Sequence, residues 1–312
     1  MIKAMILAAG EGTRLRPLTL TLPKPMVPVA NTPLLVRTVE LLRSQGVQEL
    51  AVNLYHKPEA IRAHFGTSLT YSDEAELLGT AGGVKRLEGF LDTTFAVLYG
   101  DNLYDFALEP LVRFHRESGA LATIATFETP NPTACGLVVT DAAGRVTRFQ
   151  EKPRAEEVFT NTANAGVYLL EPEVLASIPP GVACDFGRDI FPALLERFPG
   201  RVVALPLGGY LRDTGTPENY RQANWDLLTR GERGVHPGAE VAATARLEGR
   251  NVLGTGCQIA AGACLEDCIL WEGCQIGEGA QLRGAILGRG VVVGAGVVLT
   301  AGAIVGEGEI IR

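Results

Sequence analysis

The chain has 312 residues, enough for about two domains, and its composition of 46% hydrophobic and 20% charged residues is ordinary for a soluble globular protein. The formal net charge of −7 argues against nucleic acid or an anionic membrane as the main partner, although it allows a local basic pocket for phosphates. No stretch approaches the ~18 consecutive apolar residues that a membrane span needs, so we expect a cytoplasmic protein without a membrane partner.

Residues 1–230 alternate between strand-like and helix-like segments. Strands are expected at residues 4–8, 49–53, 94–98 and 120–127, and helices at residues 33–45, 58–65 and 108–118. Such alternation predicts an α/β domain with a mostly parallel, Rossmann-like three-layer sheet and helices on both faces. Ligands of these sheets bind beyond the carboxyl ends of the strands, so residues at strand ends are the first candidates for a site.

Residues 231–312 follow a different pattern, in which apolar residues recur every six positions and glycines follow many of them. The series is Val235, Val241, Leu247, Leu253, Ile259 and Leu265, then Leu270, Ile276 and Leu282, then Leu287, Val293, Leu299, Val305 and Ile311, with a slip of one residue at each break. A six-residue period is typical of a parallel β-helix, and the segment resembles the left-handed β-helix of hexapeptide-repeat proteins. We expect about four coils and a domain boundary near residue 230.

The six cysteines are read as buried structural thiols. They stand at Cys135, Cys184, Cys257, Cys264, Cys268 and Cys274. No C-x-x-C pair occurs and His236 is the one histidine near the last four, so the spacing does not favour zinc. Cys257 and Cys274 each follow an apolar repeat position by four places, where hexapeptide repeats favour a small inward residue.

A glycine-rich loop carries the strongest chemical signal. The segment Leu7–Pro17 leads from the first predicted strand through Gly10 and Gly12 to Arg14, and Pro23-Lys24-Pro25 follows. Glycines let backbone N–H groups turn toward an anion, while arginine and lysine add positive charge that suits a triphosphate. The dinucleotide-binding pattern fails at its third glycine and no Walker A motif is present, so a plain tight turn is the alternative.

These segments resemble the sugar nucleotidyltransferase family, also called NDP-sugar pyrophosphorylases, whose pattern is G-x-G-T-R-L-x-P followed by P-K-P. Further segments match the family in the same order, namely Leu78–Gly82, Gly100–Asp101, Glu151–Pro153, Asn164–Tyr168 and Gly209–Pro217. The resemblance spans the 1–230 domain, which it identifies as the catalytic domain, and leaves residues 231–312 as the β-helix.

The resemblance implies a reaction in which a sugar 1-phosphate attacks the α-phosphorus of a nucleoside triphosphate and pyrophosphate leaves, with Mg²⁺ as cofactor. The expected catalytic residues are Arg14, Lys24, Asp101, Lys152 and Asp213. Asp101 and Asp213 would bind the metal. Arg14 and Lys24 would stabilise the transition state and the leaving pyrophosphate, and Lys152 would hold the sugar phosphate. Taken singly, Asp101 and Asp213 also suit an ordinary turn.

The resemblance also implies the residues that bind the two substrates. The nucleotide would contact Ala8, Ala9, Gly10, Gly12, Thr13, Gly79 and Thr80. The sugar phosphate would contact Gly136, Glu151, Lys152 and Asn164, with Gly136 leaving room for the sugar ring. The histidines at 56, 64 and 115 lie outside the motifs and are expected to be non-catalytic.

The base and the sugar stay open at this point. Pro-Lys-Pro, Leu-Gly-Thr-Ala-Gly and a hexapeptide-repeat tail together favour members that join GTP to mannose 1-phosphate. Segments 27–31 and 98–102 suit glucose-1-phosphate thymidylyltransferases equally well, and a uridylyltransferase is a third choice. Other classes are a non-catalytic regulatory homologue and acyl transfer on the β-helix, for which His236 is the one candidate base. The flat sides of such a helix favour a homo-oligomer.

Overall fold

The computed structural model describes residues 2–312. The chain divides into two compact units, each discontinuous in sequence. The first unit joins the residues up to Gly10 with Arg37–Leu211, and the second joins Glu11–Val36 with Arg212–Arg312. The glycine-rich loop is therefore shared, because Gly10 closes the first part and Glu11 opens the second.

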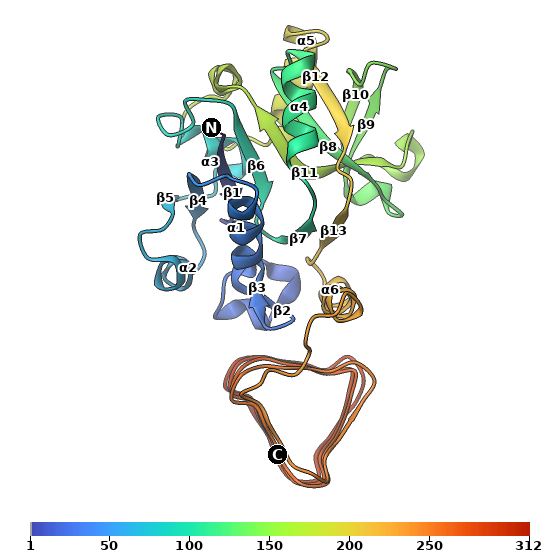
Figure 1. Ribbon diagram of the computed structural model, residues 1–312. Helices are drawn as coiled ribbons and strands as arrows, with labels where there is room; N and C mark the ends of the chain where they lie inside the picture. Colours follow the sequence, from blue (N-terminus) through green and yellow to red (C-terminus); the bar gives the residue numbers. More distant parts are fainter. Residues whose placement is uncertain (1) are drawn as a thin grey trace. The chain divides into compact units, whose positions relative to one another are not determined.

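The first unit is built on a nine-stranded sheet (Figure 1). Its strands are β1 (Lys3–Leu7), β4 (Leu50–Leu54), β5 (Thr70–Asp73), β6 (Phe95–Tyr99), β8 (Ala122–Glu128), β9 (Gly136–Thr140), β10 (Val146–Glu151), β11 (Thr162–Leu170) and β12 (Val202–Pro206). The main order is β10-β9-β11-β6-β1-β4-β5, with β8 between β11 and β12. Strands β6, β1, β4 and β5 are parallel as predicted, whereas β11 runs antiparallel to its neighbours β6, β8 and β9. The predicted Rossmann-like core is confirmed, and its second half is mixed because β11 is antiparallel to β6 and β8; the antiparallel pair β9–β10 extends this half.

The helices that accompany this sheet are α1 (Leu34–Ser44), α2 (Pro58–Phe65), α3 (Gly79–Lys85), α4 (Glu109–Ser118) and α5 (Phe191–Arg197). Three of them, α1, α2 and α4, lie close to predicted segments, whereas α3 and α5 were not predicted. The α2 prediction has the observed bounds, and the other two predicted helices and the four predicted strands differ by one or two residues at their ends. A short strand, β7 (Asn102–Asp105), follows β6.

Helices cover both faces of this sheet. Alternate residues of a strand point to opposite faces. Ile124 of β8 belongs to a core cluster with Phe191 and Leu194 of α5 and Val84 of α3. The neighbouring residue of β8, Thr123, instead hydrogen-bonds the ring of His115 on α4. Helix α4 therefore packs on the face opposite to α3 and α5, which gives the predicted three layers.

The second unit begins with irregular chain and ends in a β-helix. It holds single helical turns at Thr13–Leu15, Leu18–Leu20 and Lys24–Met26, the hairpin strands β2 (Pro28–Val29) and β3 (Thr32–Pro33), and α6 (Pro217–Thr229). Thr216 caps α6, because its side-chain oxygen accepts a hydrogen bond from the Asn219 N–H group at 3.2 Å. Strand β13 (Tyr210–Asp213) leads into this unit.

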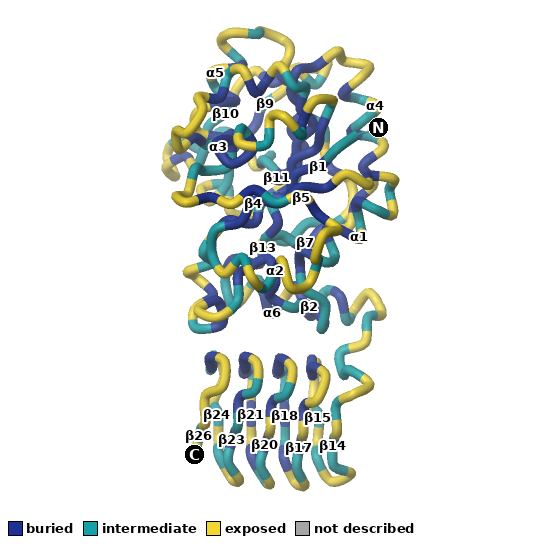
Figure 2. Tube along the Cα trace, turned by 90° about the vertical axis from the view of Figure 1, so that its left-hand side faces the viewer, coloured by how far each residue is buried: buried dark blue, intermediate teal, exposed yellow. Residues whose placement is uncertain are grey.

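The β-helix has three parallel sheets that form a triangular prism (Figure 1). One sheet holds β14 (Glu240–Val241), β17 (Gln258–Ile259), β20 (Gln275–Ile276), β23 (Val292–Val293) and β26 (Ile310–Ile311). A second holds β15 (Arg246–Glu248), β18 (Cys264–Glu266), β21 (Gln281–Arg283) and β24 (Val298–Leu299), and the third holds β16 (Val252–Leu253), β19 (Ile269–Leu270), β22 (Ile286–Leu287) and β25 (Ile304–Val305). Figure 2 shows the successive coils lying side by side. The left-handed β-helix of about four coils is confirmed.

The two slips in the repeat correspond to a shortened corner. Leu253 pairs with Leu270, and Leu270 with Leu287, so these coils are one residue shorter than three hexapeptides. The register is otherwise kept, and the repeat residues stack in one narrow core. Cys257 and Cys274 lie in this core with no solvent exposure, and their thiols donate to the carbonyl oxygens of Trp271 and Gly288. The prediction of buried thiols at these two positions is confirmed.

Candidate active site

The glycine-rich loop starts where two parallel strands of the first unit end. The N–H group of Gly100, just after β6, donates to the carbonyl oxygen of Leu7 at the end of β1 over 2.8 Å. A side chain on Gly100 would meet that oxygen at 2.8 Å, so only glycine lets the strand ends approach so closely. Asp101 therefore lies beside the point where Ala8 and Ala9, both buried, enter the loop.

A buried polar relay connects the start of this loop to the predicted base-binding segment. The Ala8 N–H group donates to Asn53 Oδ1 at 2.7 Å, and Asn53 Nδ2 donates to Glu74 Oε1 at 2.7 Å. The second oxygen of Glu74 accepts from the Leu78 N–H group at 3.1 Å. Asn53 and Glu74 did not stand out in the sequence. Because both side chains are buried and hydrogen-bonded, they hold the loop after β1 and the segment before α3 in a fixed relative position.

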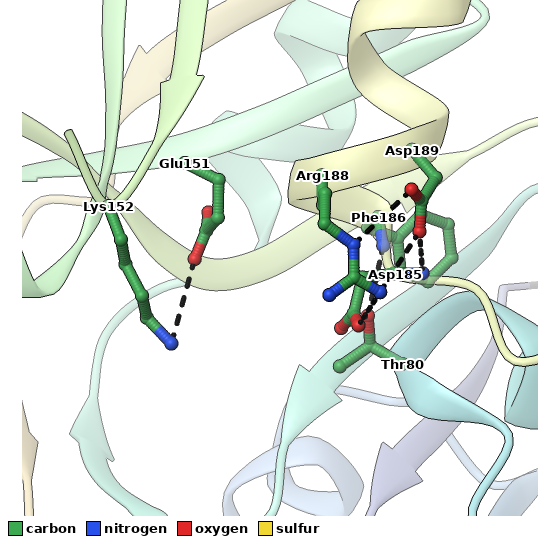
Figure 3. A network of polar contacts seen from close by, with 7 residues as sticks. All are labelled: Thr80, Glu151, Lys152, Asp185, Phe186, Arg188 and Asp189. Carbon is green, nitrogen blue, oxygen red and sulfur yellow. Dashed lines mark hydrogen bonds and ion pairs between the residues drawn. The ribbon is translucent and has the colours of Figure 1, made fainter.

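Thr80 lies in the first turn of α3 and is held by a loop far away in sequence (Figure 3). Its hydroxyl donates to Asp185 Oδ1 at 3.0 Å and accepts from the Phe186 N–H group at 3.0 Å. Gly79 has a positive φ of 71°, and a side chain there would meet the backbone of Cys184. The glycines of this segment therefore allow α3 to begin directly against the 184–186 backbone.

Glu151 is the last residue of strand β10, and Lys152 follows it (Figure 3). Lys152 Nζ lies 3.9 Å from Glu151 Oε1, and two thirds of the lysine side chain is exposed. Lys152 has a φ of 44°, in the left-handed region that a residue with a side chain rarely adopts, and its N–H group donates to the Cys135 carbonyl oxygen. Such strain is common at functional positions. Burial raises the pKa of the Glu151 carboxyl group, an effect that Lys152 opposes.

Asn164 belongs to a hydrogen-bonded chain with two tyrosines. Its side-chain amide donates to Tyr168 Oη at 2.7 Å, and the Tyr168 hydroxyl donates to Tyr99 Oη at 3.1 Å. Asn164 Oδ1 accepts from the Gly166 N–H group at 2.9 Å, across a bulge in β11. Burial raises the pKa of Tyr99 to about 12, and the negative charges of Glu151 and Asp185 add to the rise.

Gly136 does not open onto empty space. A Cβ atom on this residue would lie 2.5 Å from Glu151 Oε2 and 2.7 Å from the ring of Phe149. The absent side chain thus makes room for the Glu151 carboxylate, which is itself a predicted sugar-binding group.

Lys24 and Gly12 pack against each other in the second unit. Lys24 is only 4% exposed, and a side chain on Gly12 would meet its Cβ atom at 2.8 Å. Gly12 has a φ of 64°, and its carbonyl oxygen accepts from the Thr19 hydroxyl at 2.8 Å. The adjacent Thr13 is exposed. Glycine is therefore needed at position 12 for both the turn and the packing of the lysine stem.

Asp213 brings the remaining predicted groups of this unit together. Its Oδ1 atom lies 3.5 Å from Lys24 Nζ and accepts from the Gly215 N–H group at 2.8 Å. A Cβ atom on Gly215 would meet Arg14 Nη2 at 2.5 Å and Asp213 Oδ1 at 2.9 Å, so the guanidinium of Arg14 lies over this glycine. Two cations and one carboxylate thus converge from segments about 190 residues apart in sequence.

The predicted residues fall into two groups. Within the second unit, Arg14, Lys24 and Asp213 lie together. Within the first, Glu151, Asn164 and Thr80 surround the Tyr99–Tyr168 pair, and Asp101 stands at the end of β6. Asp185 and Arg188 were missed, and no motif in the sequence marks them. Arg188 Nη2 donates to Asp185 Oδ2 at 3.1 Å.

The described residues contain neither a cluster of metal-binding side chains nor a membrane-spanning helix. Among residues 2–312, no three or more His, Cys, Asp or Glu side chains gather closely enough to hold a metal by themselves. None of the helices in the same residues combines the length and the apolar character needed to cross a membrane.

Comparison with known proteins gives two family matches. The family described as "Nucleotidyl transferase" matches residues 3–230, and the family described as "GMPPB C-terminal domain" matches residues 229–312. Together they account for nearly the whole chain.

Individual relatives agree with these matches. A UTP–glucose-1-phosphate uridylyltransferase from Synechocystis sp. is 36% identical over 87% of this chain and 83% of its own length. A mannose-1-phosphate guanylyltransferase from Mycobacterium tuberculosis is 35% identical over 87% of this chain and 80% of its own length. Among solved structures, HddC from Yersinia pseudotuberculosis has a TM-score of 0.62 at 27% identity and covers 73% of this chain and 100% of its own. The chain belongs to the sugar nucleotidyltransferase family.

Proposed function

We propose that this protein joins GTP to mannose 1-phosphate and releases pyrophosphate. The observation that carries the proposal is the convergence of Arg14, Lys24 and Asp213 beside the glycine-rich loop. A buried lysine and an arginine next to a carboxylate suit a triphosphate whose negative charge must be neutralised for attack at the α-phosphorus.

The oxygen donors fit Mg²⁺. This ion prefers one or two carboxylates together with phosphate oxygens and waters, and it does not require a complete protein cage. Asp213 is about half exposed, at 47% of its side chain, so its carboxylate is accessible to a ligand. Asp101 and Asp213 would hold the ion. When bound, Mg²⁺ supplies positive charge that offsets the repulsion between the two phosphate groups.

The protein's own groups position the reactants. The reaction needs no covalent intermediate, so catalysis consists of alignment and charge stabilisation. We assign Arg14 and Lys24 to the departing pyrophosphate and Lys152 to the sugar phosphate. The exposed ammonium of Lys152 projects from a strained backbone, which suits a fixed contact with an anion. Glu151 and Asn164 would hydrogen-bond the sugar hydroxyl groups, and Gly79 and Thr80 would contact the base.

The choice of GTP and mannose 1-phosphate is supported by the relatives. The C-terminal match and the guanylyltransferase of Mycobacterium tuberculosis both favour it. A uridylyltransferase for glucose 1-phosphate is the second candidate, because the Synechocystis relative is equally similar over the same share of the chain. One altered hydrogen-bond partner can change base or sugar preference by a large factor, so similarity near 35% does not separate the two.

A substrate matrix tests the proposal. The purified protein is mixed with Mg²⁺, each of GTP, UTP, dTTP, ATP and CTP, and a panel of sugar 1-phosphates, and pyrophosphate release is measured. We expect the highest kcat/KM for GTP with mannose 1-phosphate. A higher value for UTP or dTTP with glucose 1-phosphate would select the alternative. The absence of release with every pair would favour a regulatory homologue. The same preparation, examined by light scattering, tests the expected homo-oligomer.

A further inference from the structure

Two glycines confine the Glu151 carboxylate. A Cβ atom placed on Gly187 would overlap Glu151 Oε2 and lie 3.0 Å from Glu151 Cδ. A Cβ atom on Gly136 would lie 2.5 Å from the same Oε2 atom. Gly187 belongs to the helical turn Phe186–Ile190, whereas Gly136 opens strand β9. We call Gly136 and Gly187 the glycine cradle, since the carboxylate lies between these two positions.

The carboxylate in this cradle lacks hydrogen-bond donors. In the part of the chain that the structure describes, neither backbone nor side-chain donors bond to it, and Lys152 Nζ is its nearest cation at 3.9 Å. The side chain is 29% exposed, so it keeps one route to a ligand. Burial raises the pKa of this carboxyl group, which is the mark of a charge that still lacks stabilising contacts. A partly buried acceptor of this kind can take hydrogen bonds from a ligand that reaches it.

Other polar groups surround the same space. Asp185 comes just before the turn that contains Gly187 and Arg188 lies within it, and Figure 3 shows the two bonded to each other. The charge of Asp185 raises the pKa of Glu151 and that of Arg188 lowers it. Asp185 is already bonded to Thr80 and Arg188, whereas the Glu151 carboxylate has steric confinement and the distant Lys152 ammonium to set its direction.

We propose that Gly187 is a positioning residue that determines sugar specificity: the absence of its side chain keeps the Glu151 carboxylate directed at the hydroxyl groups of the sugar 1-phosphate. The inference rests on the proposed function, because it concerns the sugar side of that reaction. Hydroxyl groups that differ in orientation between epimers can be distinguished only if their acceptor is fixed, and the cradle supplies that restraint.

Gly187 can be replaced by alanine without straining the backbone. It does not have a positive φ, so alanine adds no backbone strain, and alanine is the better helix former of the two. The new methyl group would meet the end of a flexible side chain, which can rotate away without unfolding the protein. Gly136→Ala is less suitable, because its methyl group would also meet the Phe149 ring at 2.7 Å.

The experiment compares Gly187→Ala with the wild type in the pyrophosphate-release assay. The displaced carboxylate should raise KM for the sugar 1-phosphate roughly 10- to 100-fold, since misplacement by about 1 Å has effects of that order. KM for the nucleotide should stay within about twofold of the wild type. The ratio of kcat/KM between the best sugar and its epimers should fall. Urea denaturation should show an unfolding free energy no lower than that of the wild type.

Two controls separate steric displacement from a general disturbance. Gly89→Ala adds a methyl group at an exposed glycine with no atom within 4 Å and should leave all parameters unchanged. In a Glu151→Ala background the Gly187→Ala change has no carboxylate to displace. There it should have almost no further effect, so the double-mutant cycle should be strongly non-additive.

The outcomes distinguish the inference from the proposed function. A wild-type protein that releases no pyrophosphate with any substrate pair defeats the proposed function and, with it, the inference. An active wild type whose Gly187→Ala variant keeps its sugar KM and its epimer ratio overturns the inference alone. Equal effects of Gly187→Ala in the presence and absence of the Glu151 carboxylate would overturn it as well.

Discussion

At the scale of single residues, Lys24 is the group whose environment is most unusual. A lysine that is 4% exposed is rare, because burying an ammonium group is costly unless anions surround it. The carboxylate of Asp213 is itself half exposed and lies 3.5 Å from Lys24 Nζ, which is long for a strong ion pair. The 3.5 Å separation leaves the Asp213 carboxylate, which is half exposed, accessible to the metal ion proposed above.

Asp213→Asn should abolish most turnover without unfolding the protein. Asparagine keeps an oxygen that can accept from the Gly215 N–H group but removes the negative charge that would hold the metal. We expect kcat/KM to fall by about 100-fold or more, as is usual when a group that stabilises transition-state charge is lost. Pyrophosphate release at a series of Mg²⁺ concentrations measures the effect, and the apparent requirement for Mg²⁺ should rise.

Asp141→Asn is the matched control. Asp141 Oδ1 accepts from the Ala143 and Arg145 N–H groups in a turn, much as Asp213 accepts from Gly215. Asp141 is not one of the proposed site residues. This variant should be fully active. Near-normal rates for Asp213→Asn at low Mg²⁺ would show that Asp213 only shapes its turn.

At the scale of elements, the parallel pair β1–β6 fixes the position of Asp101. Because Gly100 has no side chain, β6 can end in direct contact with β1. Gly100→Ala would push its methyl group against the Leu7 carbonyl oxygen and the Ile6 side chain, at 2.8 and 2.9 Å. We expect the unfolding free energy to fall by about 1–3 kcal/mol, the usual cost of overpacking.

Urea denaturation followed by circular dichroism measures this loss. Turnover should also fall in the folded variant, since Asp101 is the next residue. Gly89→Ala again serves as the control with open space around the added methyl group. A Gly100→Ala protein as stable as the wild type would mean that the strand ends can separate at little cost.

The elements themselves were largely predictable, because their signals are local. The helix α2 and the hexapeptide coils follow directly from periodicity and from flanking glycines. The antiparallel half of the sheet could not be predicted in this way. The direction of β11 depends on the edge from which the chain re-enters the sheet, between β6 and β8. The periodicity of β11 is the same whichever direction it runs.

Only the site residues that stand in a recognisable motif could be predicted from the sequence. Asp101 and Asp213 stand in recognisable segments, and the sequence could name them. The relay through Asn53 and Glu74 forms because β4 pairs with β1 and with β5, after which Glu74 follows. These pairings join distant segments, so no local sequence pattern predicts the relay. Asp185 likewise meets Thr80 across 105 positions of sequence, which only the folded chain brings together.

The packing of α4 on β8 introduces a pH-sensitive element. His115 is 1% exposed, its Nδ1 lies 2.7 Å from Thr123 Oγ1 and its Nε2 lies 3.0 Å from Glu171 Oε1. Burial lowers the pKa of His115 below its ordinary value of 6.5, although Glu171 opposes the shift. The unfolded chain therefore binds a proton at a pH where the folded protein does not. Stability should decrease as pH falls from about 6.5 toward the lower pKa of the folded state.

Urea denaturation at pH values from 8 to 5 tests this expectation. His115→Gln should be less stable near neutrality, because it loses buried contacts, but its stability should vary less over the same range. A wild-type curve as flat as that of the variant would show that Glu171 compensates fully for the burial of the ring.

At the scale of the whole molecule, the second unit joins the proposed phosphate-binding loop to the β-helix. Tyr220 on α6 is fully buried, and its hydroxyl donates to the Pro28 carbonyl oxygen at 2.6 Å while accepting from Trp271 Nε1 at 2.9 Å. Asn224, one turn later, accepts from the Ala30 N–H group at 2.8 Å. The β2–β3 hairpin that follows Lys24 is thus held by α6, and α6 is held by a coil of the β-helix. The β-helix therefore supports part of the proposed active site.

Tyr220→Phe tests this support. The phenyl ring keeps the packing, but the Pro28 carbonyl and the Trp271 N–H group both lose their partner in a buried place. Each unsatisfied group costs about 1–3 kcal/mol, so the unfolding free energy should decrease measurably. Because the lost bond restrains the segment just after Lys24, KM for the nucleotide should rise while KM for the sugar 1-phosphate stays unchanged. Tyr71→Phe removes an exposed hydroxyl that donates to the Gly66 carbonyl oxygen and should change neither quantity. If Tyr220→Phe lowers stability but leaves the nucleotide KM at the wild-type value, the β-helix stabilises the unit without holding the loop.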